Sequence, residues 1–160
     1  MVDYAYFSDG LLVGVFSLRG HLTIQKTGTY TDGSHLHRPA ARVIGFNDEV
    51  PPAFNYLALT YGGSIKSTRY GKSVLEFLGK NKVEVICSAL ADSPVDIPAY
   101  LSVQLNVMLE FLSMELPKGG YLTRFEYETI KAIKNKREEL YQKLTALHKE
   151  TSAQSKKKKV

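Results

Sequence analysis

The chain has 160 residues, of which 44% are hydrophobic and 23% charged, and its formal net charge is +5. This length allows one domain that removes roughly two thirds of its unfolded-chain surface from water. No apolar run approaches the roughly 18 residues that a membrane span needs, and the N-terminal stretch MVDYAYFSDG lacks the basic start of a secretory or transit signal. We therefore expect a soluble intracellular protein, either cytoplasmic or organellar, with no signal peptide.

The single cysteine and the placement of charge narrow the classes further. Cys87 has no second cysteine to pair with, which excludes an intrachain disulfide and a cysteine-built zinc site, and we expect it to be a small buried hydrophobe. Residues 1–121 carry 10 Lys or Arg against 11 Asp or Glu, whereas residues 122–160 carry 11 against 5. Within 21–80, seven basic residues outnumber four acidic ones. This distribution allows two separate regions that face anions.

The first third of the chain predicts a helix followed by a hairpin. Residues 9–18 are apolar on nearly all sides, which indicates a buried helix, and Gly14 would let a second backbone approach closely. After Gly20, Leu22 and Ile24 alternate with polar residues, as in a half-buried strand. The turn-rich stretch around residues 30–39 precedes AARVIGF, so 21–47 is predicted to be a hairpin with a long loop.

A second helix and a second hairpin follow. Asn47 or Asp48 could cap the helix, Pro51 and Pro52 suit its first turn, and Gly62-Gly63 ends it. The segment SIKSTRYGKSVLEFLG predicts a hairpin with its turn at Gly71-Lys72. In this hairpin Ile65 points inward, and Lys66, Thr68 and Tyr70 alternate onto the other face.

Three helices are predicted in the rest of the chain. NKVEVICSAL could be a strand, but Val83, Ile86, Cys87 and Leu90 fall at helical spacing and favour a short helix. Pro98 opens a helix whose apolar side consists of Leu101, Leu105, Met108, Leu109 and Leu112. Thr123 and Glu126 form a capping box for a last helix that runs to about Lys149. We therefore predict one domain over 1–150 and a disordered basic tail over 151–160, which is either a solubilising end or a phosphate-binding arm.

The order of these elements predicts an α+β fold: a four-stranded antiparallel sheet with helices on one face. The other face would stay open and would carry hydrogen-bonding and cationic side chains: Thr23, Gln25, Thr27, Thr29, Lys66, Thr68 and Tyr70. Such a face could bind the groove of a nucleic acid, or it could be an ordinary solvated sheet surface, because Thr and Tyr are common in strands.

The segment LLVGVFSLRG resembles the LAGLIDADG signature of homing endonucleases and intron maturases. Leu12, Gly14 and Gly20 match it directly, and Val15 and Phe16 keep the apolar type. The resemblance continues in FNDEVPPAFNYLALTYGGSI and in YLSVQLNVMLEFL, and it covers roughly residues 4–150. It implies an αββαββα-type fold, a saddle-shaped sheet over nucleic acid, and an intron-encoded origin. A single motif copy implies a homodimer whose motif helices meet through Leu11, Val13, Gly14 and Ser17, although Val13 replaces the usual small residue.

The departures from the motif bear on catalysis. In the family the eighth motif position is an acid that holds a divalent cation, and here it is Arg19, whose guanidinium stays protonated and cannot bind Mg²⁺. The sixth position, usually acidic, is Ser17. The lysine that the family places before the later helix's glutamine is also missing, since Ser102 and Val103 stand between Leu101 and Gln104. The resemblance therefore implies a binder without nuclease chemistry, and an arginine at position 19 could bind a phosphate instead.

His21, His35 and His37 lack flanking carboxylates or cysteines at ligand spacing, so we predict no metal site and no cofactor. If their loop reaches a nucleic acid, Arg38 and these histidines would contact phosphates. No phosphate-binding glycine loop and no nucleophile elbow is recognisable.

The resulting hypothesis is a catalytically inactive protein that binds duplex DNA or structured RNA across its sheet. The expected phosphate contacts are Lys26, Arg42, Lys66, Arg69 and Lys72, and the side chains nearer base edges are Gln25, Thr27, Thr68 and Tyr70. One alternative is an RNA-binding component of a ribonucleoprotein, maturase-like or ribosome-associated. Others are a protein-interaction module without nucleic-acid binding and an active nuclease that uses a relocated acid such as Asp9 or Glu76.

Overall fold

A computed structural model describes residues 4–30, 33–45, 49–68, 70–114 and 124–157. Helices and strands follow one another as the sequence predicted: one helix, two strands, a helix, two strands and three helices. The elements are α1 (Tyr4–Arg19), β1 (Gly20–Thr29), β2 (His35–Ile44), α2 (Pro52–Tyr61), β3 (Ser64–Ser67), β4 (Ser73–Leu78), α3 (Lys80–Ala91), α4 (Ala99–Ser113) and α5 (Arg124–Lys157).

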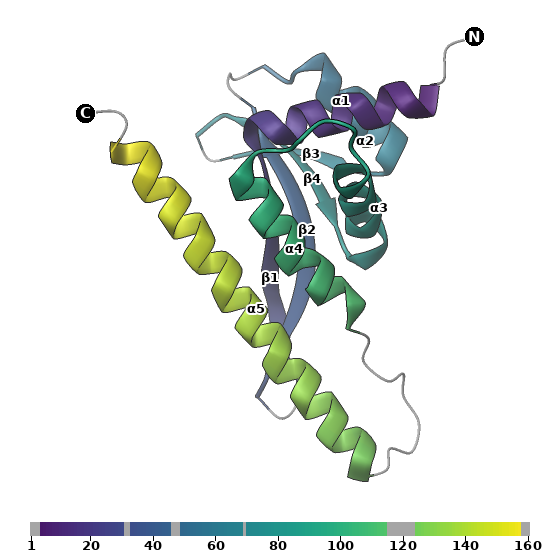
Figure 1. Ribbon diagram of the computed structural model, residues 1–160. Coiled ribbons are helices and arrows are strands. Elements are labelled where there is room, and N and C mark those ends of the chain that lie inside the picture. Colours follow the sequence, from purple (N-terminus) through teal and green to yellow (C-terminus); the bar gives the residue numbers. More distant parts are fainter. Residues whose placement is uncertain (1–3, 31–32, 46–48, 69, 115–123, 158–160) are drawn as a thin grey trace.

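The four strands form one sheet in the order β1-β2-β4-β3, and every neighbouring pair is antiparallel. In Figure 1, α4 and α5 lie in front of the long β1–β2 hairpin, and α3 lies beside β4. The core fills the space between this face of the sheet and the helices, with Leu22, Val43 and Phe77 from the strands and Leu101 and Met108 from α4. The predicted α+β architecture with helices on one face is therefore confirmed.

The junction of α1 and β1 has no connecting loop. Helix α1 ends at Arg19 and strand β1 begins at Gly20, whose carbonyl accepts a hydrogen bond from the Tyr100 hydroxyl at 3.2 Å. A Cβ on Gly20 would lie 2.3 Å from Cδ1 of Phe16, so a side chain at this position would collide with the core. The glycine thus fixes where the motif helix ends relative to the sheet.

Helix α2 ends as predicted, because Gly62 adopts the left-handed conformation with φ of 77° and its N–H bonds to the carbonyl of Ala58. Its N-cap is Pro51, whereas the predicted caps Asn47 and Asp48 lie outside the described residues. Residues 80–91 form a helix rather than a strand, and the four apolar residues that favoured this interpretation are all buried. Cys87 is among them, and burial raises the pKa of its thiol to about 12, as expected for a structural cysteine.

Helix α5 corrects the prediction for the C-terminal end of the chain. It runs to Lys157, so residues 151–157 are helical rather than a disordered tail. The segment TSAQSKK contains neither Gly nor Pro, so nothing in it interrupts a helix that has already formed. The predicted capping residue Thr123 lies outside the described residues.

In α4, Leu109 is 40% exposed, whereas the other four predicted apolar residues are buried.

Candidate nucleic-acid interface

The strand register assigns side chains to the face of the sheet opposite the core. His21 pairs with Arg42, Thr23 with Ala40, and Gln25 with Arg38. Arg42 in turn pairs with Glu76, and Glu76 with Ser64. Because residues paired across strands share a face, and because Leu22, Ala41, Val43 and Leu75 at the alternate positions lie in the core, these polar residues occupy the other face. We call them, together with Lys66 and without His21, whose ring packs against His148 of α5, the open sheet face.

A buried carboxylate at the centre of this face holds two of its cations. Glu76 is only 4% exposed, and its two oxygens lie 3.0 Å from Nε of Arg42 and 2.7 Å from Nζ of Lys66. A buried carboxylate needs such partners, because an unpaired charge away from water is costly. Arg42 and Lys66 keep 33% and 57% of their side-chain surface exposed. The pairs leave one net positive charge at this position, and both cations remain accessible to an anion.

Gln25 and Arg38 form the next polar pair along the β1–β2 hairpin. Nη2 of Arg38 donates a hydrogen bond to Oε1 of Gln25 at 3.0 Å. A β-bulge shifts the register between Lys26 and Gly28, and Thr27 lies exposed at that irregularity. The predicted phosphate contact and the two predicted base-edge residues therefore lie close together on one stretch of the hairpin.

The structure places Lys26 on the opposite side from Gln25, toward the helices. Its Nζ lies 2.9 Å from Oε1 of Glu138 in α5 and 4.6 Å from the centre of the Tyr141 ring. His37, which pairs with Lys26 across the strands, lies 2.7 Å from the other oxygen of Glu138. Adjacent residues of a strand point to opposite faces, so Lys26 and Gln25 cannot both belong to the open sheet face. Lys26 is therefore removed from the predicted phosphate contacts.

Glu138 is held ionised by these neighbours. Burial acts to raise its pKa, but hydrogen bonds from Lys26, Gln142 and His37 lower the pKa to about 2. No local sequence pattern reveals this cluster, because Glu138 follows Lys26 by 112 positions. Only a long α5 lying along β1 brings the two side chains together.

The turn between β3 and β4 carries the remaining predicted contacts. Thr68 and Tyr70 follow the end of β3 at Ser67, so they lie in the turn and do not continue the strand alternation that the sequence predicted. Oγ1 of Thr68 accepts hydrogen bonds from the backbone N–H groups of Tyr70 and Lys72. Tyr70 is 73% exposed and Lys72 is also exposed, at the end of the hairpin. Arg69 lies outside the described residues.

The residues of helix α1 that carry the motif resemblance lie in two different environments. Leu12 and Phe16 are fully buried in the core. Gly14 is exposed, and a Cβ built on it meets nothing within 4 Å, so the helix surface there is open. Ser17 and Arg19, at the acidic positions of the motif, are half-buried. Leu11, another predicted dimer contact, is half-buried and packs against the core, as Val13 does.

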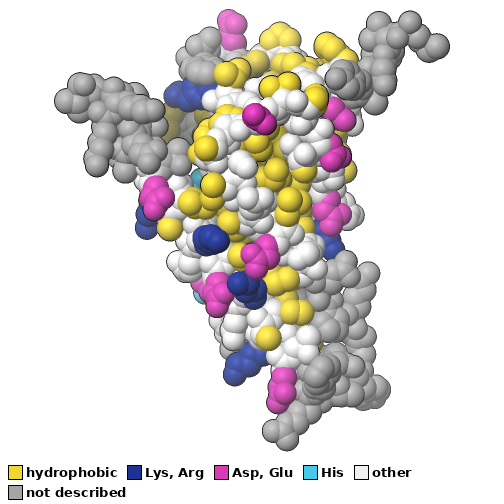
Figure 2. All heavy atoms as spheres, in the orientation of Figure 1, with side chains coloured by type: hydrophobic (Ala, Val, Ile, Leu, Met, Phe, Trp, Pro, Cys, Tyr) yellow, Lys and Arg dark blue, Asp and Glu magenta, His cyan; other side chains and the backbone are white. Residues whose placement is uncertain are grey.

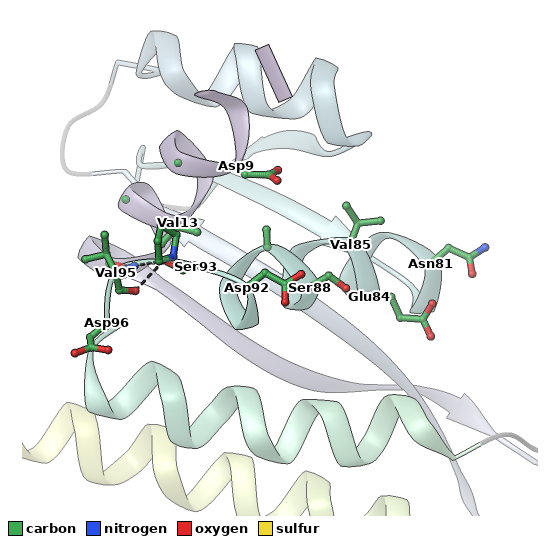
Figure 3. Close-up of a pocket in the computed structure, with 15 residues that line it drawn as sticks. Asp9, Val13, Asn81, Glu84, Val85, Ser88, Asp92, Ser93, Val95 and Asp96 are labelled. Carbon is green, nitrogen blue, oxygen red and sulfur yellow. Dashed lines mark hydrogen bonds between the residues drawn. The ribbon is translucent and has the colours of Figure 1, made fainter. Parts of the chain in front are cut away.

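A groove lies beside Gly14, between α1, α3 and residues 93–96, and its volume is about 890 Å³. Figure 3 shows Val13 of α1 across from Val95, with Val85 and Ser88 on the neighbouring turns of α3. Three of the four predicted dimer contacts, Val13, Gly14 and Ser17, line this groove. The structure thus gathers these three into one surface, which we call the α1–α3 groove.

The two acids considered for a relocated nuclease centre lie apart. Glu76 is committed to Arg42 and Lys66 on the sheet, whereas Asp9 is in α1, where it accepts a hydrogen bond from the Tyr61 hydroxyl. In the part of the chain that the structure describes, no three His, Cys, Asp or Glu side chains are grouped so that they could hold a metal ion.

The predicted histidines are also separated. His37 binds Glu138, whereas the ring of His21 packs edge-on against His148 of α5, with ring centres 5.4 Å apart. Burial, together with the charges of His148 and Arg42, lowers the pKa of His21 to about 4. His148 lies 2.9 Å from the Leu22 carbonyl oxygen, so this pair attaches α5 to the edge strand β1.

Among the described residues, no helix is long and apolar enough to cross a membrane.

Comparisons with known proteins place this geometry in a fold family. No protein-family model matches the sequence, and no curated protein matches it. Among solved structures, the homing endonuclease I-CvuI in complex with the I-CreI target superposes with a TM-score of 0.67 at 12% identity, over 90% of this chain and 83% of that chain. I-TnaI, also a homing endonuclease, superposes with a TM-score of 0.58 at 15% identity, over 87% of this chain and 97% of that chain. The LAGLIDADG homing endonuclease I-GzeII in complex with its DNA target gives 0.63 at 12% identity, over 83% of this chain and 43% of that one. The resemblance seen in LLVGVFSLRG is thus confirmed at the level of architecture, and the chain has the LAGLIDADG homing-endonuclease fold.

Proposed function

We propose that the protein binds nucleic acid across the open sheet face and does not cleave it. The observation that carries this proposal is the set of cationic and hydrogen-bonding side chains on the one sheet face that the helices leave uncovered. Arg42 and Lys66 lie at its centre, and Gln25 and Arg38 lie along the hairpin. Cations positioned over a β surface contact phosphates, and glutamine, threonine and arginine side chains can read base edges. The solved structures of similar fold include two endonucleases in complex with DNA.

The affinity is expected to be modest. Glu76 offsets one of the two central positive charges, and Lys26 is neutralised by Glu138 on the other side of the sheet. Phosphate neutralisation supplies most non-specific affinity. Each phosphate contact steepens the slope of the logarithm of duplex affinity against the logarithm of salt concentration by about 0.9. A face with few free cations therefore relies on shape and base contacts, or on further cations supplied by an assembly.

The absence of nuclease chemistry is supported by the motif positions in α1. Arg19 and Ser17 occupy positions where the motif resemblance expects carboxylates, and both are at the sheet end of the helix. A guanidinium repels a divalent cation and donates hydrogen bonds to phosphate oxygens. At this position it would hold a strand without activating water, and so we infer a binder that came from an endonuclease scaffold.

The homodimer that the resemblance implies stays a prediction. It requires a second copy of α1 to cross at Gly14, where the structure leaves open space. A ribosome-associated or maturase-like role also stays a prediction, because cationic and hydrogen-bonding side chains on a β surface do not discriminate between a DNA duplex and the wide minor groove of an RNA helix.

The test is a selection of bound sequences from randomised duplex DNA and structured RNA libraries, carried out without divalent cations. The enriched pools are then incubated with the protein and Mg²⁺, and the ends are sequenced. We expect enrichment from one library, binding that weakens steeply with salt, and intact strands. Discrete cut sites within the enriched sequence would contradict the inference from Arg19, and the absence of enrichment from both libraries would contradict nucleic-acid binding and favour a protein-interaction module.

A further inference from the structure

A second cavity lies on the helical side of the molecule, where α3 begins and α4 ends. Its volume is about 240 Å³, and its walls come from β2, from the start of α3, from the end of α4 and from α5. In Figure 1, α4 lies between α3 and α5. None of the described residues that line this cavity also lines the α1–α3 groove, so the two are separate. We call it the α3–α5 cavity.

The lining of the α3–α5 cavity is cationic. Among the nine described residues that line it, four are Lys, Arg or His, and none is Asp or Glu. Figure 2 shows acidic and basic side chains interspersed over this side of the molecule, so the cavity differs in charge from its surroundings. Of the four, Arg38 donates its hydrogen bond on the open sheet face, and His37 is bound to Glu138. Lys80 and Arg137 are therefore the two cations on which a site here depends.

Arg137 of α5 has a donor that the protein does not use. Its Nη2 donates a hydrogen bond to the carbonyl oxygen of Met114 at 3.2 Å, and its guanidinium carbon lies 5.3 Å from the centre of the Phe111 ring. Its Nε–H is buried and has no hydrogen-bond partner among the described residues. Burial lowers the pKa of the guanidinium, and no described carboxylate offsets that effect. A buried donor without an acceptor is costly, so a ligand that accepts from it gains affinity.

The start of α3 supplies further donors. Gly79 precedes this 12-residue helix, and no described side chain caps it. The first N–H groups of a helix lack partners within the helix, and the helix dipole favours an anion beside them. Gly79 has φ of 94°, and a Cβ built on it meets nothing within 4 Å, so the backbone here is open. Lys80, whose side chain is 40% exposed, lies in the same first turn.

The rest of the wall is apolar. Phe111 and Leu112 are 3% and 7% exposed, and Pro39 and Met114 also line the cavity. Apolar walls with a few convergent polar groups are typical of small-molecule sites. Such sites have volumes of about 300–1,000 Å³ for drug-sized ligands, so a cavity of about 240 Å³ limits its ligand to a smaller molecule.

We propose that the α3–α5 cavity binds a small phosphate monoester with an apolar organic group. Arg137 and the N-terminus of α3 hold the phosphate oxygens, Lys80 balances the charge, and Phe111 contacts the organic group. A phosphate monoester fits better than a carboxylate, because it carries about −1.5 to −2 charge near pH 7 and offers three acceptor oxygens to two cations and a helix N-terminus. This site does not depend on nucleic-acid binding at the open sheet face.

The experiment is an NMR titration of the full-length, ¹⁵N-labelled protein in a buffer without phosphate. Phenyl phosphate carries both features of the proposed ligand. Inorganic phosphate lacks the organic group, benzyl alcohol lacks the charge, and benzoate has a single charge. We expect phenyl phosphate to bind saturably and at least about tenfold more tightly than benzyl alcohol or inorganic phosphate, with benzoate between. The signals that move most should be the Arg137 Nε–H and the backbone amides of Gly79 and Lys80.

Three variants locate the effect. Arg137→Lys keeps the charge but loses the planar donor fork, and it should weaken phenyl phosphate binding by about tenfold or more. Lys80→Gln changes a partly exposed side chain, and it should weaken binding by about two- to fivefold. Lys82→Gln is the matched control, because it removes an exposed lysine of the same helix that does not line the cavity. Melting temperatures without ligand identify any variant that is destabilised.

Three results would overturn the proposal. The first is a phenyl phosphate titration that does not saturate, or one whose shifts fall on Arg42 and Lys66 instead of Arg137. The second is inorganic phosphate that binds as tightly as phenyl phosphate, which would mean that the cavity attracts anions without recognising an organic group. The third is an equal loss of affinity in Lys80→Gln and Lys82→Gln, which would make net charge the cause.

Discussion

The open sheet face and the α1–α3 groove differ in charge and in how their charged groups are used. On the sheet face, the central carboxylate Glu76 is buried and holds Arg42 and Lys66 at 3.0 and 2.7 Å. In the groove, the carboxylates are exposed around apolar side chains. The first surface suits phosphates, and the second repels them. One chain with a single core therefore presents two surfaces of opposite charge character.

The largest expected effect comes from a core residue that packs α1, one wall of the α1–α3 groove, against the sheet. Phe16 lies fully buried in α1, and its ring centre is 6.4 Å from that of Phe77 in β4. Phe16→Ala would leave a cavity between the motif helix and the sheet and should lower the free energy of unfolding by about 3–5 kcal/mol. Urea unfolding monitored by circular dichroism measures this change.

The exposed Phe7 in the same helix provides the control, because Phe7→Ala removes the same ring from a largely solvated position. Phe7→Ala should lower the free energy of unfolding by far less than Phe16→Ala does. Equal losses for the two variants would mean that α1 is not anchored through Phe16.

How much the sequence could predict depends on the range of the interaction. Local patterns correctly predicted the helix at 80–91 and its buried residues, the end of α2 at Gly62, and the inward position of Ile65. Each of these depends on residues a few positions apart, because periodicity and turn chemistry are local properties. The order of these elements was then sufficient to predict the sheet and its covered face.

Contacts between distant segments were not predictable in the same way. Lys26 was expected to contact phosphate, but Glu138 on α5 lies on the core side and binds it there. The partners of Glu76 follow from the register of β2, β3 and β4, and the α1–α3 groove follows from where residues 93–96 lie against α1. None of these has a signature in a single sequence, since each depends on the packing of elements that are far apart in the chain.

Acid should loosen the contact between α5 and the edge strand before it affects either surface directly. The pKa of His21 is lowered to about 4 by burial and by the nearby charges of His148 and Arg42. Its unfolded-state pKa is near 6.5, so the unfolded chain binds more protons between pH 6.5 and 4, and stability falls as pH falls through that window, by up to about 3 kcal/mol. Urea midpoints at pH 7, 5 and 4 measure the loss.

His21→Gln should reduce that loss, and His35→Gln, which changes an exposed histidine, should not. The cluster of Glu138 titrates in a separate window. Its lowered pKa of about 2 means that its stabilisation persists down to about pH 4.5 and is lost only as pH falls further toward 2. If His21→Gln and the wild type lose stability equally between pH 6.5 and 4, burial of His21 is not the cause.

Glu76→Gln separates the stability of the open sheet face from its binding. The amide can no longer balance Arg42 and Lys66, and we expect a loss of about 1–2 kcal/mol, below that of a fully buried pair because both cations are partly solvated. The freed cations should strengthen nucleic-acid binding and steepen its salt dependence by roughly 1 to 2. Glu139→Gln, at an exposed carboxylate of α5, is the matched control. Weaker binding by Glu76→Gln at a temperature where it remains folded would contradict a phosphate-facing role for Arg42 and Lys66.

The smallest expected effect comes from removing one positive charge, either on the open sheet face or on the helical side of the molecule. Arg38 donates to Gln25 on the sheet face, whereas Lys82 is an exposed cation at the start of α3, on the helical side of the molecule. Arg38→Gln and Lys82→Gln remove the same charge, so a ligand that responds only to net charge would lose affinity equally with both. If the sheet face is the interface, Arg38→Gln alone should weaken binding to the selected sequence and reduce the salt dependence by about 0.9. Fluorescence anisotropy across a salt series distinguishes the two outcomes, and equal losses would place the nucleic acid elsewhere on the chain.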